Sequence, residues 1–459
     1  MAVWRTITSK NLSFGLRFDP EFYHPDFFLL RNDLEKIGVY TIGDVKDVIG
    51  YGLQAKPDYL DSGVDYIRAL NLKEFGISEE ILKIGKYQIP SGDYISKEGD
   101  ILITRSGANC GDTGVIENGF IGATYGSYII RIRVKKLNPF FVFAFLQSKF
   151  GRFQTIQIRT GLAQPNLSIP YIENLIQIPK NFSEELQAQI EKLIKDAFRK
   201  QREVNTLYQE AEQELLERMG WYEIDTKHIL DYQTTSKDVF GNGRIDPEFY
   251  QPKFVNLINH LNKIGSRKIG GFCAMPNRGV QPLYDENGEF LVINSKHLGT
   301  TEIDIQSAEK TTERFYNENT TEKARLNKYD VLMYSTGAYV GRTNTYLEDA
   351  PGIANNHVSI IRPEKKICNP LYLALFLNSK AGLMQTDQRA SGSAQREIYP
   401  QDIVKYDVFI PEKNNKPDLE WQEKLADKII QAYEAKNQAK QKLQEAKELV
   451  EDEIGKLIN

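Results

Sequence analysis

Two long segments of the chain have hydrophobic or small residues at alternating three- and four-residue intervals, the pattern of a helix with one apolar stripe. The first segment, residues 183–220, contains no proline and no internal glycine. Ser183 is a suitable N-cap, and Gly220 stands where a glycine commonly ends a helix. At about 1.5 Å per residue the helix would be roughly 55 Å long. Its stripe consists of Ile190, Ile194, Ala197, Val204, Tyr208, Ala211 and Leu215.

The second segment, residues 418–459, follows Pro417 and repeats this pattern in the same phase, 235 residues later. Its stripe consists of Leu425, Ile429, Ala432, Ala439, Leu443, Ala446 and Val450. The alanines indicate that two helices pack closely. Because a globular segment separates the two helices, we predict an antiparallel intramolecular coiled coil.

The globular segments are copies of one another. Residues 17–25 (RFDPEFYHP) return at 244–252 (RIDPEFYQP) with seven of nine positions identical. Further pairs are GDILITRSGA at 99–108 with YDVLMYSTGA at 329–338, FLQSK at 145–149 with FLNSK at 376–380, and GLAQ at 161–164 with GSAQ at 392–395. The sequence therefore predicts a tandem duplication. Its predicted parts are globular unit 1–182, helix 183–219, globular unit 220–417 and helix 418–459.

Each globular unit has a mixed pattern that predicts an α+β fold. We expect opening helices at 25–37 and 252–264, and helices after Asn138-Pro139 and Asn369-Pro370. Strands are expected at 64–70, 290–293, 128–134 and 358–362, and the GDILITRSG and YDVLMYSTG segments predict buried strands that end in glycine turns. Residues 51–94 and 278–321 align poorly apart from turn residues. A shared frame with different loops is typical of two related binding modules with different ligands.

Composition sets the first limits on function. The net charge is −4, but the acidic excess lies on the two long helices, so the globular units are neutral to slightly basic and could carry a basic face. The three cysteines and five histidines are scattered, which argues against a disulfide framework or a metal site. No apolar run reaches membrane-spanning length and no signal peptide is evident, so we expect a cytoplasmic protein.

The motifs favour binding over catalysis. The sequence has no phosphate-binding loop, no dinucleotide fingerprint and no nucleophile elbow. Residues 138–141 (NPFF) are similar to the motif with which DNA aminomethyltransferases hold the target amine, but the second proline is missing and no glycine-rich methyl-donor motif accompanies it. We interpret Asn-Pro as a helix start. Likewise, Arg17, Asp19 and Tyr23 are interpreted as a structural corner rather than a functional triad.

Several glycine-containing turns could bring small polar groups, arginine and glutamine to phosphates or base edges. Each turn alone is an ordinary surface turn, but their distribution over both copies favours a DNA-binding role. The candidate residues in the first copy are Gln54, Lys56, Arg105, Ser106, Asn109, Arg159, Thr160 and Gln164. Those in the second copy are Arg278, Gln281, Asn294, Lys296, Ser335, Thr336, Tyr339, Arg389, Ser391, Gln395 and Arg396.

The duplicated arrangement of globular unit and long helix resembles the specificity subunit of type I restriction-modification systems. The motifs that carry the resemblance are RxDPEFYxP, the GDILITRSG strand and turn, NPxx with FLxSK, and GxAQ followed by an Ile-Pro pair, and it covers essentially the whole chain. The resemblance implies two target-recognition domains that each recognise half of a bipartite DNA sequence, with the helices as a spacer. It also implies a non-catalytic chain without a cofactor of its own. Two methyltransferase subunits would bind S-adenosylmethionine, and endonuclease subunits could join them.

Two other functions stay open from the residues alone. The chain could be a coiled-coil scaffold whose globular units bind protein or carbohydrate, in which case salt-dependent affinity for duplex DNA would be absent. It could also be a DNA methyltransferase in its own right, although the sequence shows no cofactor pocket.

Overall fold

The computed structural model of the chain describes residues 17–54, 56–73, 76–78, 81–161, 163–392 and 395–458. Its contacts divide the chain into two compact units. Unit 1 comprises Met1–Arg202 and Ala435–Asn459, and unit 2 comprises Glu203–Glu434. Each unit therefore contains one globular region together with part of both long helices.

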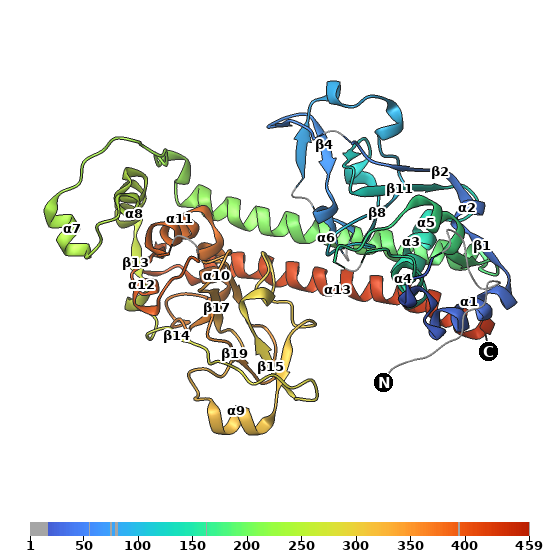
Figure 1. Cartoon of the computed structure of the whole chain (residues 1–459). Helices are drawn as coiled ribbons and strands as arrows, with labels where there is room; N and C mark the ends of the chain where they lie inside the picture. The colour runs from blue at the N-terminus through green and yellow to red at the C-terminus, as the bar shows by residue number, and fades with distance from the viewer. Residues whose placement is uncertain are drawn as a thin grey trace. The chain divides into compact units, whose positions relative to one another are not determined.

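The two long helices are α6 (Glu184–Arg218) and α13 (Leu419–Ile458), drawn in green and red in Figure 1. The Ser183 hydroxyl accepts the amide of Leu186 at 3.1 Å, which confirms the predicted cap. Gly220, with φ of 66°, follows the end of α6 in the left-handed conformation that favours glycine. The predicted stripe residues are buried on both helices, apart from Tyr208, which is partly buried.

Ion pairs inside each unit show that the helices are antiparallel. In unit 2 the end of α6 lies against the start of α13, because Arg218 contacts Asp418 at 2.6 Å and Glu214 contacts Lys424 at 2.8 Å. In unit 1 the first half of α6 lies against the last half of α13, with Asp196 3.7 Å from Lys442. The predicted antiparallel helix pair is confirmed.

The globular region of unit 1 is built on a four-stranded antiparallel sheet with strand order β2-β11-β8-β9 and a second sheet with strand order β10-β4-β7-β3. The strands of the first sheet are β2 (Lys46–Tyr51), β11 (Ile129–Val134), β8 (Ile101–Thr104) and β9 (Thr113–Val115). Those of the second are β10 (Thr124–Tyr125), β4 (Val64–Ile67), β7 (Leu82–Ile84) and β3 (Tyr59–Leu60). Short ladders pair β1 (Val39–Thr41) with β12 (Gln177–Pro179) and β5 (Leu72–Lys73) with β6 (Gly76–Ile77). The helices are α1 (Pro25–Ile37), α2 (Ile42–Val45), α3 (Pro139–Gln147), α4 (Lys149–Gln157) and α5 (Ile169–Leu175).

Unit 2 repeats this frame with sheets of order β14-β20-β17-β18 and β16-β15-β19. The strands are β14 (Asn277–Arg278), β20 (Val358–Ile361), β17 (Val331–Tyr334), β18 (Thr343–Thr345), β16 (Glu309–Thr311), β15 (Phe290–Ile293) and β19 (Gly352–Ala354). Two ladders pair β13 (Ser266–Lys268) with β21 (Asp407–Phe409) and β22 (Glu412–Lys413) with β23 (Lys416–Pro417). The helices are α7 (Ser236–Asn242), α8 (Pro252–Ile264), α9 (Glu313–Asn319), α10 (Pro370–Asn378), α11 (Lys380–Arg389) and α12 (Pro400–Ile403).

The duplicated Asn-Pro dipeptides start two buried helices, as predicted. The Asn138 side-chain oxygen accepts the amides of Phe140 and Phe141, and Asn369 caps α10 in the same way. Both helices are apolar on nearly every side because they form the centre of their units' cores. The Asn-Pro motif therefore holds a helix end and not a substrate amine.

One predicted strand is shorter than expected. Strand β4 ends at Ile67 instead of residue 70, because the Arg68 amide donates to the Asn71 side chain at 2.8 Å and a 3-10 turn begins there. The other predicted strands and opening helices are confirmed to within a residue or two.

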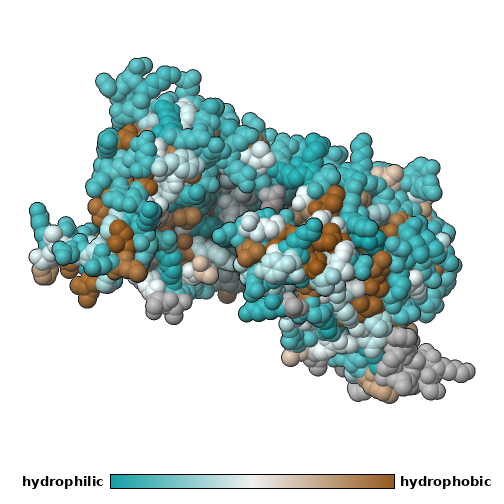
Figure 2. Space-filling model, turned by 90° about the horizontal axis from the view of Figure 1, so that it is seen from above, coloured by the Kyte–Doolittle hydropathy of each residue, from teal (hydrophilic) through white to brown (hydrophobic). Residues whose placement is uncertain are grey.

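Hydrophilic residues cover most of the surface in Figure 2, with smaller hydrophobic patches between them. Over the described ranges, no helix combines the length and apolar character needed to cross a bilayer. The same ranges contain no group of three or more His, Cys, Asp or Glu side chains arranged to hold a metal ion.

Candidate nucleic-acid interface

A turn between two strands organises the candidate site in each unit: residues 126–128 in unit 1 and residues 355–357 in unit 2. The same five backbone hydrogen bonds surround both turns. With the amide donor named first and the carbonyl acceptor second, the bonds of unit 1 are Gly52 to Ile129 (3.0 Å), Leu53 to Tyr125 (2.8 Å), Gly126 to Ile67 (3.0 Å), Ile129 to Gly126 (3.0 Å) and Arg105 to Tyr128 (2.7 Å). In unit 2 they run from Gly279 to Val358 (3.0 Å), Val280 to Ala354 (3.0 Å), Asn355 to Ile293 (2.9 Å), Val358 to Asn355 (3.1 Å) and Ser335 to His357 (2.8 Å). The backbone frame of the two sites is therefore the same.

A glycine is required at the same place in both frames. A Cβ atom on Gly52 would lie 2.3 Å from the Gly126 carbonyl oxygen, and one on Gly279 would lie 1.9 Å from the Ala354 carbonyl oxygen. Neither oxygen belongs to a flexible side chain, so neither can move aside cheaply. The poorly aligned segments thus share one residue that the backbone geometry demands.

A second loop closes over the first turn in each unit. Thr160 and Asn166 exchange two backbone hydrogen bonds of 2.9 and 2.8 Å, and Ser391 and Glu397 exchange two of 2.8 Å. Backbone carbonyls of these loops also accept hydrogen bonds from the glycine turns. The Gly107 amide donates to the Pro165 carbonyl (3.1 Å), and the Gly337 amide donates to the Arg396 carbonyl (2.9 Å). The predicted candidate turns are therefore brought together in each unit. Leu162, Ser393 and Ala394 of the two loops, and Ala55 beside Gln54, lie outside the described residues.

We name these assemblies loop cluster 1 and loop cluster 2. Loop cluster 1 comprises residues 51–54, 68–71, 105–109, 126–128, 159–161 and 163–166. Loop cluster 2 comprises residues 278–281, 294–297, 335–339, 355–357, 389–392 and 395–397. Of the predicted contacts, only Lys56 lies outside them, exposed just beyond loop cluster 1.

Loop cluster 1 presents arginine and amide side chains. The Arg105 guanidinium lies over the Tyr51 ring, 4.5 Å from its centroid. The Gln164 amide donates to the Ser106 hydroxyl at 3.3 Å, and Gln54 donates to the Gly52 carbonyl at 2.8 Å. Gln54, Asn109 and Gln164 are exposed, whereas Arg105, Ser106, Arg159 and Thr160 are half-buried. The exposed amides have the donor and acceptor pair that suits an adenine edge.

Loop cluster 2 holds three of its four lysine and arginine side chains in ion pairs. Arg278 donates to Glu397 at 2.6 Å and to the Ile398 carbonyl at 2.9 Å, and it lies over the Tyr399 ring. A hydrogen bond from Tyr399 is the largest cause that lowers the pKa of Glu397, and Arg278 lowers it further. Glu397 is therefore ionised at neutral pH. Arg396 pairs with Asp387 at 2.9 Å, and Lys296 pairs with Glu309.

Three predicted contacts in unit 2 lie at buried or partly buried positions. Ser335 is fully buried and donates to Ser359 at 2.6 Å. Asn294 is buried, where it accepts the Lys296 amide and donates to Glu309 at 2.8 Å. Burial lowers the pKa of Arg389, and only part of its side chain is accessible. Because serine, asparagine and arginine also fulfil structural roles at strand and helix ends, the sequence pattern did not separate these three from surface residues.

The remaining candidates in unit 2 are accessible to different degrees. Gln281 and Gln395 are exposed, and Tyr339 is 57% exposed with Arg342 stacked on its ring at 4.2 Å. Thr336 and Ser391 are half-buried, and both hydrogen-bond to Glu397. These residues line the same loop cluster.

Sequence reasoning missed residues at two matched positions. Arg68 corresponds to Asn294, because each amide donates to the residue three positions later, Asn71 at 2.8 Å and His297 at 3.1 Å. Tyr128, which is 60% exposed, corresponds to His357 on the central turn. The corresponding side chains differ, so sequence identity between the copies carried no signal for them.

The family model described as the type I restriction modification DNA specificity domain matches the sequence twice, at residues 35–213 and 263–448. The two matches cover well over half of the 459 residues and fall on the two copies. The chain belongs to the type I restriction-modification specificity family. Each unit therefore contains one specificity domain, a class of domain that recognises DNA sequence.

Three solved structures are similar to this two-domain chain. An S subunit of a type I restriction-modification system from M. genitalium is 12% identical, with 91% of this chain and 95% of that chain covered and a TM-score of 0.44. A structure on complex assembly and conformational transition of a type I R-M system is 16% identical over 92% and 97%, with a TM-score of 0.30. The HsdS subunit from Thermoanaerobacter tengcongensis is 17% identical over 92% and 96%, with a TM-score of 0.28. No curated protein matches the sequence significantly.

The duplicated RxDPEFY corner supports the loop of each specificity domain. Arg17 pairs with Asp19 and donates to the carbonyls of Ile158 (3.1 Å) and Arg159 (2.7 Å), while the Tyr23 hydroxyl donates to the Arg17 carbonyl at 2.8 Å. Arg244 makes the corresponding bonds to Asp246 and to the Arg389 carbonyl. The corner is structural, as predicted, and fixes the start of the second loop.

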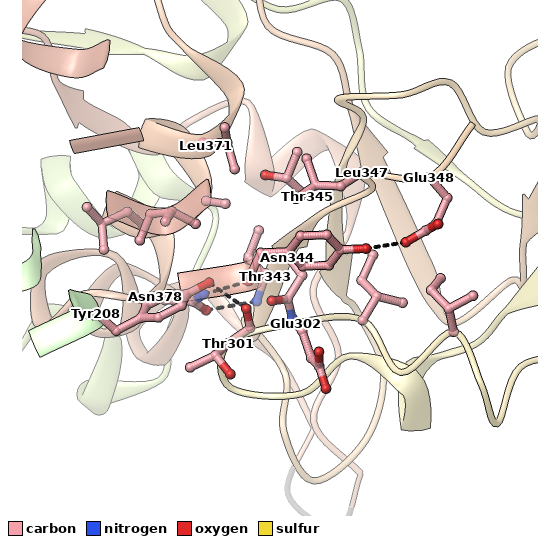
Figure 3. Close-up of a pocket in the computed structure, with 16 residues that line it drawn as sticks. Tyr208, Thr301, Glu302, Thr343, Asn344, Thr345, Leu347, Glu348, Leu371 and Asn378 are labelled. Carbon is pink, nitrogen blue, oxygen red and sulfur yellow. Dashed lines mark hydrogen bonds between the residues drawn. The ribbon is translucent and has the colours of Figure 1, made fainter. Parts of the chain in front are cut away.

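A pocket in the second specificity domain lies away from loop cluster 2 (Figure 3). It has a volume of about 30 Å³, which is room for about one water molecule. The Tyr208 hydroxyl of α6 donates to the Thr301 carbonyl across it, and the Thr343 amide donates to the side-chain oxygen of Asn378 at 2.8 Å. The pocket holds none of the candidate residues and serves to pack the domain on its helices.

Proposed function

We propose that the chain is the specificity subunit of a type I restriction-modification complex, in which each specificity domain recognises one half of a bipartite duplex sequence. The observation that carries the proposal is the identical backbone frame of the two loop clusters, which present different side chains at matched positions. Tyr51 corresponds to Arg278, Arg105 to Ser335, and Tyr128 to His357. Two copies of one scaffold with different contact groups suit a target with two different halves.

In this proposal, exposed side-chain amides that their loops hold in place recognise the bases. Gln164 and Gln395 occupy the same position at the tip of the second loop, and both are exposed. A glutamine amide can bond bidentately to adenine in the major groove. The half-buried residues around it, such as Thr160 and Ser391, hold the loop in one conformation.

The long helices would set the distance between the half-sites and dock two methyltransferase subunits. Charged side chains cover the outer faces of α6 and α13, and the stripe between the helices is buried. In this proposal the methyltransferase subunits bind S-adenosylmethionine and carry out methylation, and endonuclease subunits can join the complex. This chain would take no part in the chemistry and would bind no cofactor.

Selection from a randomised duplex library tests the proposal, with the chain alone and with its methyltransferase subunits. Enrichment of two short motifs separated by a fixed gap is the expected result. If the folded complex enriches no sequence, the proposal is wrong, and a scaffold that binds protein or carbohydrate becomes the better explanation. Enrichment of a single uninterrupted motif would show that only one domain contacts bases.

A further inference from the structure

Three arginines of loop cluster 1 have uncharged counterparts in loop cluster 2. The shared backbone hydrogen bonds match Arg68 to Asn294 and Arg105 to Ser335. Thr160 and Ser391 make the same loop-closing backbone bonds, so the residues before them, Arg159 and Ala390, also correspond. The two clusters thus share a frame, and at these three matched positions only loop cluster 1 carries a positive charge.

These arginines have no carboxylate partner within the part of the chain that the structure describes. All three are half-buried, and the Nε atom of each is buried without a hydrogen-bond partner. Arg105 is held against Tyr51 by a cation–π contact. Half-buried guanidinium groups without acceptors suit an anionic ligand, because a phosphate would supply the missing acceptors.

Loop cluster 2 has four lysine and arginine side chains, of which three are neutralised within the domain and Arg389 has no ion pair among the described residues. Arg278 pairs with Glu397 at 2.6 Å, Arg396 pairs with Asp387 at 2.9 Å, and Lys296 pairs with Glu309. The counterpart of Glu397 in loop cluster 1 is Asn166, which carries no charge. The lowered pKa of Glu397 keeps its carboxylate ionised at neutral pH.

We infer that the specificity domain of unit 1 supplies most of the phosphate contacts, and with them most of the salt-dependent DNA affinity, through Arg68, Arg105 and Arg159. The specificity domain of unit 2 supplies fewer, because among the described residues of loop cluster 2 only Arg389 lacks a carboxylate partner. This division rests on the proposed function, since the ligand is duplex DNA. Its physical basis is counterion release, because only cations that are free to neutralise phosphates release bound salt ions.

A reciprocal exchange of charge between the matched loop positions tests the inference. Asn166→Glu would place a carboxylate at the position that corresponds to Glu397, on the strand segment that pairs with Ser106, and Glu397→Asn would release Arg278. The full chain, assembled with its methyltransferase subunits, is titrated with the selected duplex and with an unrelated duplex at about 50 to 200 mM salt. The measured quantity is the slope of log K against log salt concentration.

We expect Asn166→Glu to reduce the steepness of that slope by about one, and Glu397→Asn to increase it by about one. Arg105→Gln should also reduce it by about one, and it adds no new charge that could disturb folding. Arg314→Gln is the matched control, because Arg314 lies on α9 in an exposed pair with Glu318 outside both loop clusters. Its slope should equal that of the unchanged protein.

The outcomes separate this inference from the proposed function. If Arg105→Gln leaves the slope unchanged, or if Arg278→Gln reduces it as much as Arg105→Gln does, the division of charge is wrong. Slopes that respond as expected on the unrelated duplex, while the library yields no selected sequence, would uphold the charge division and reject sequence recognition. Absence of binding to either duplex rejects both.

Discussion

At the scale of single residues, the strictest requirement in each specificity domain is the glycine at the central turn. We expect Gly279→Ala to destabilise unit 2 by about 3 kcal/mol, because the new Cβ would lie 1.9 Å from the Ala354 carbonyl oxygen. Urea denaturation measures this change. Gly50→Ala on β2 is the control, since a Cβ added there would have no atom within 4 Å. Equal midpoints for the two variants would contradict the prediction.

A second prediction at this scale concerns base recognition. Gln164→Ala should relax sequence preference in one half-site only, and Gln395→Ala in the other, each at a cost of about 1–3 kcal/mol on the cognate duplex. The frequencies of bases in a repeated library selection give the result. A uniform loss of affinity for all sequences would instead assign the glutamine to loop structure or phosphate contact.

Individual candidate residues could be selected from the sequence only where the two copies kept the same residue type or a turn motif. Gln164 and Gln395 stand out because the GxAQ motif is duplicated. Arg68 gave no such signal, because its counterpart is Asn294 and the two are matched only by their capping bonds. Ser335 was predicted as a contact because it precedes a glycine turn, but its hydroxyl faces Ser359 on the neighbouring strand.

At the scale of elements, the long helices were predictable because their apolar stripes keep one phase from Ile190 to Leu215 and from Leu425 to Val450. The buried helices after Asn138 and Asn369 were predictable from local capping chemistry. The loop clusters were not, because their hydrogen bonds join residues far apart in the chain. The bond from Arg105 to Tyr128, for example, has no local sequence signal.

The helix pair yields a prediction of lower stability for one substitution and of higher stability for its control. Ala432 is fully buried on the stripe of α13, so Ala432→Leu should overpack the seam and cost about 1–3 kcal/mol of unfolding free energy. Gly455 is in the same helix with no atom within 4 Å of an added Cβ. Gly455→Ala should therefore stabilise the protein by about 0.5–1 kcal/mol. Urea denaturation compares the two, and a stabilising Ala432→Leu would show that the seam is loosely packed.

At the scale of the whole molecule, a net charge of −4 conceals three different regions. The helices are acidic, and loop cluster 1 carries three unpaired arginines among the described residues. In loop cluster 2, Arg278, Lys296 and Arg396 form ion pairs within the domain and Arg389 does not. Total charge is therefore a poor guide to nucleic-acid binding in this chain. The local pairing of each cation decides whether it can neutralise a phosphate.

The division of the chain also indicates how to test the spacer role of the helices. The boundary between the units falls inside both helices, at Arg202 and Glu203 of α6 and at Glu434 and Ala435 of α13. One heptad inserted at each boundary would leave the residues of both units unchanged. It would lengthen the helix pair by roughly 10 Å and rotate it by only about 20°.

We expect the gap between the half-sites to grow by about three base pairs, at about 3.4 Å per base pair, while both half-site sequences stay the same. Removal of seven residues from each helix should shorten the gap by a similar amount. Library selection with the complete complex measures both changes. An insertion in α6 alone is the control, because it shifts the pairs of Glu214 with Lys424 and of Asp196 with Lys442 out of register and should destabilise the protein. A gap that does not change after the paired insertion would show that contacts other than the helices set the half-site distance.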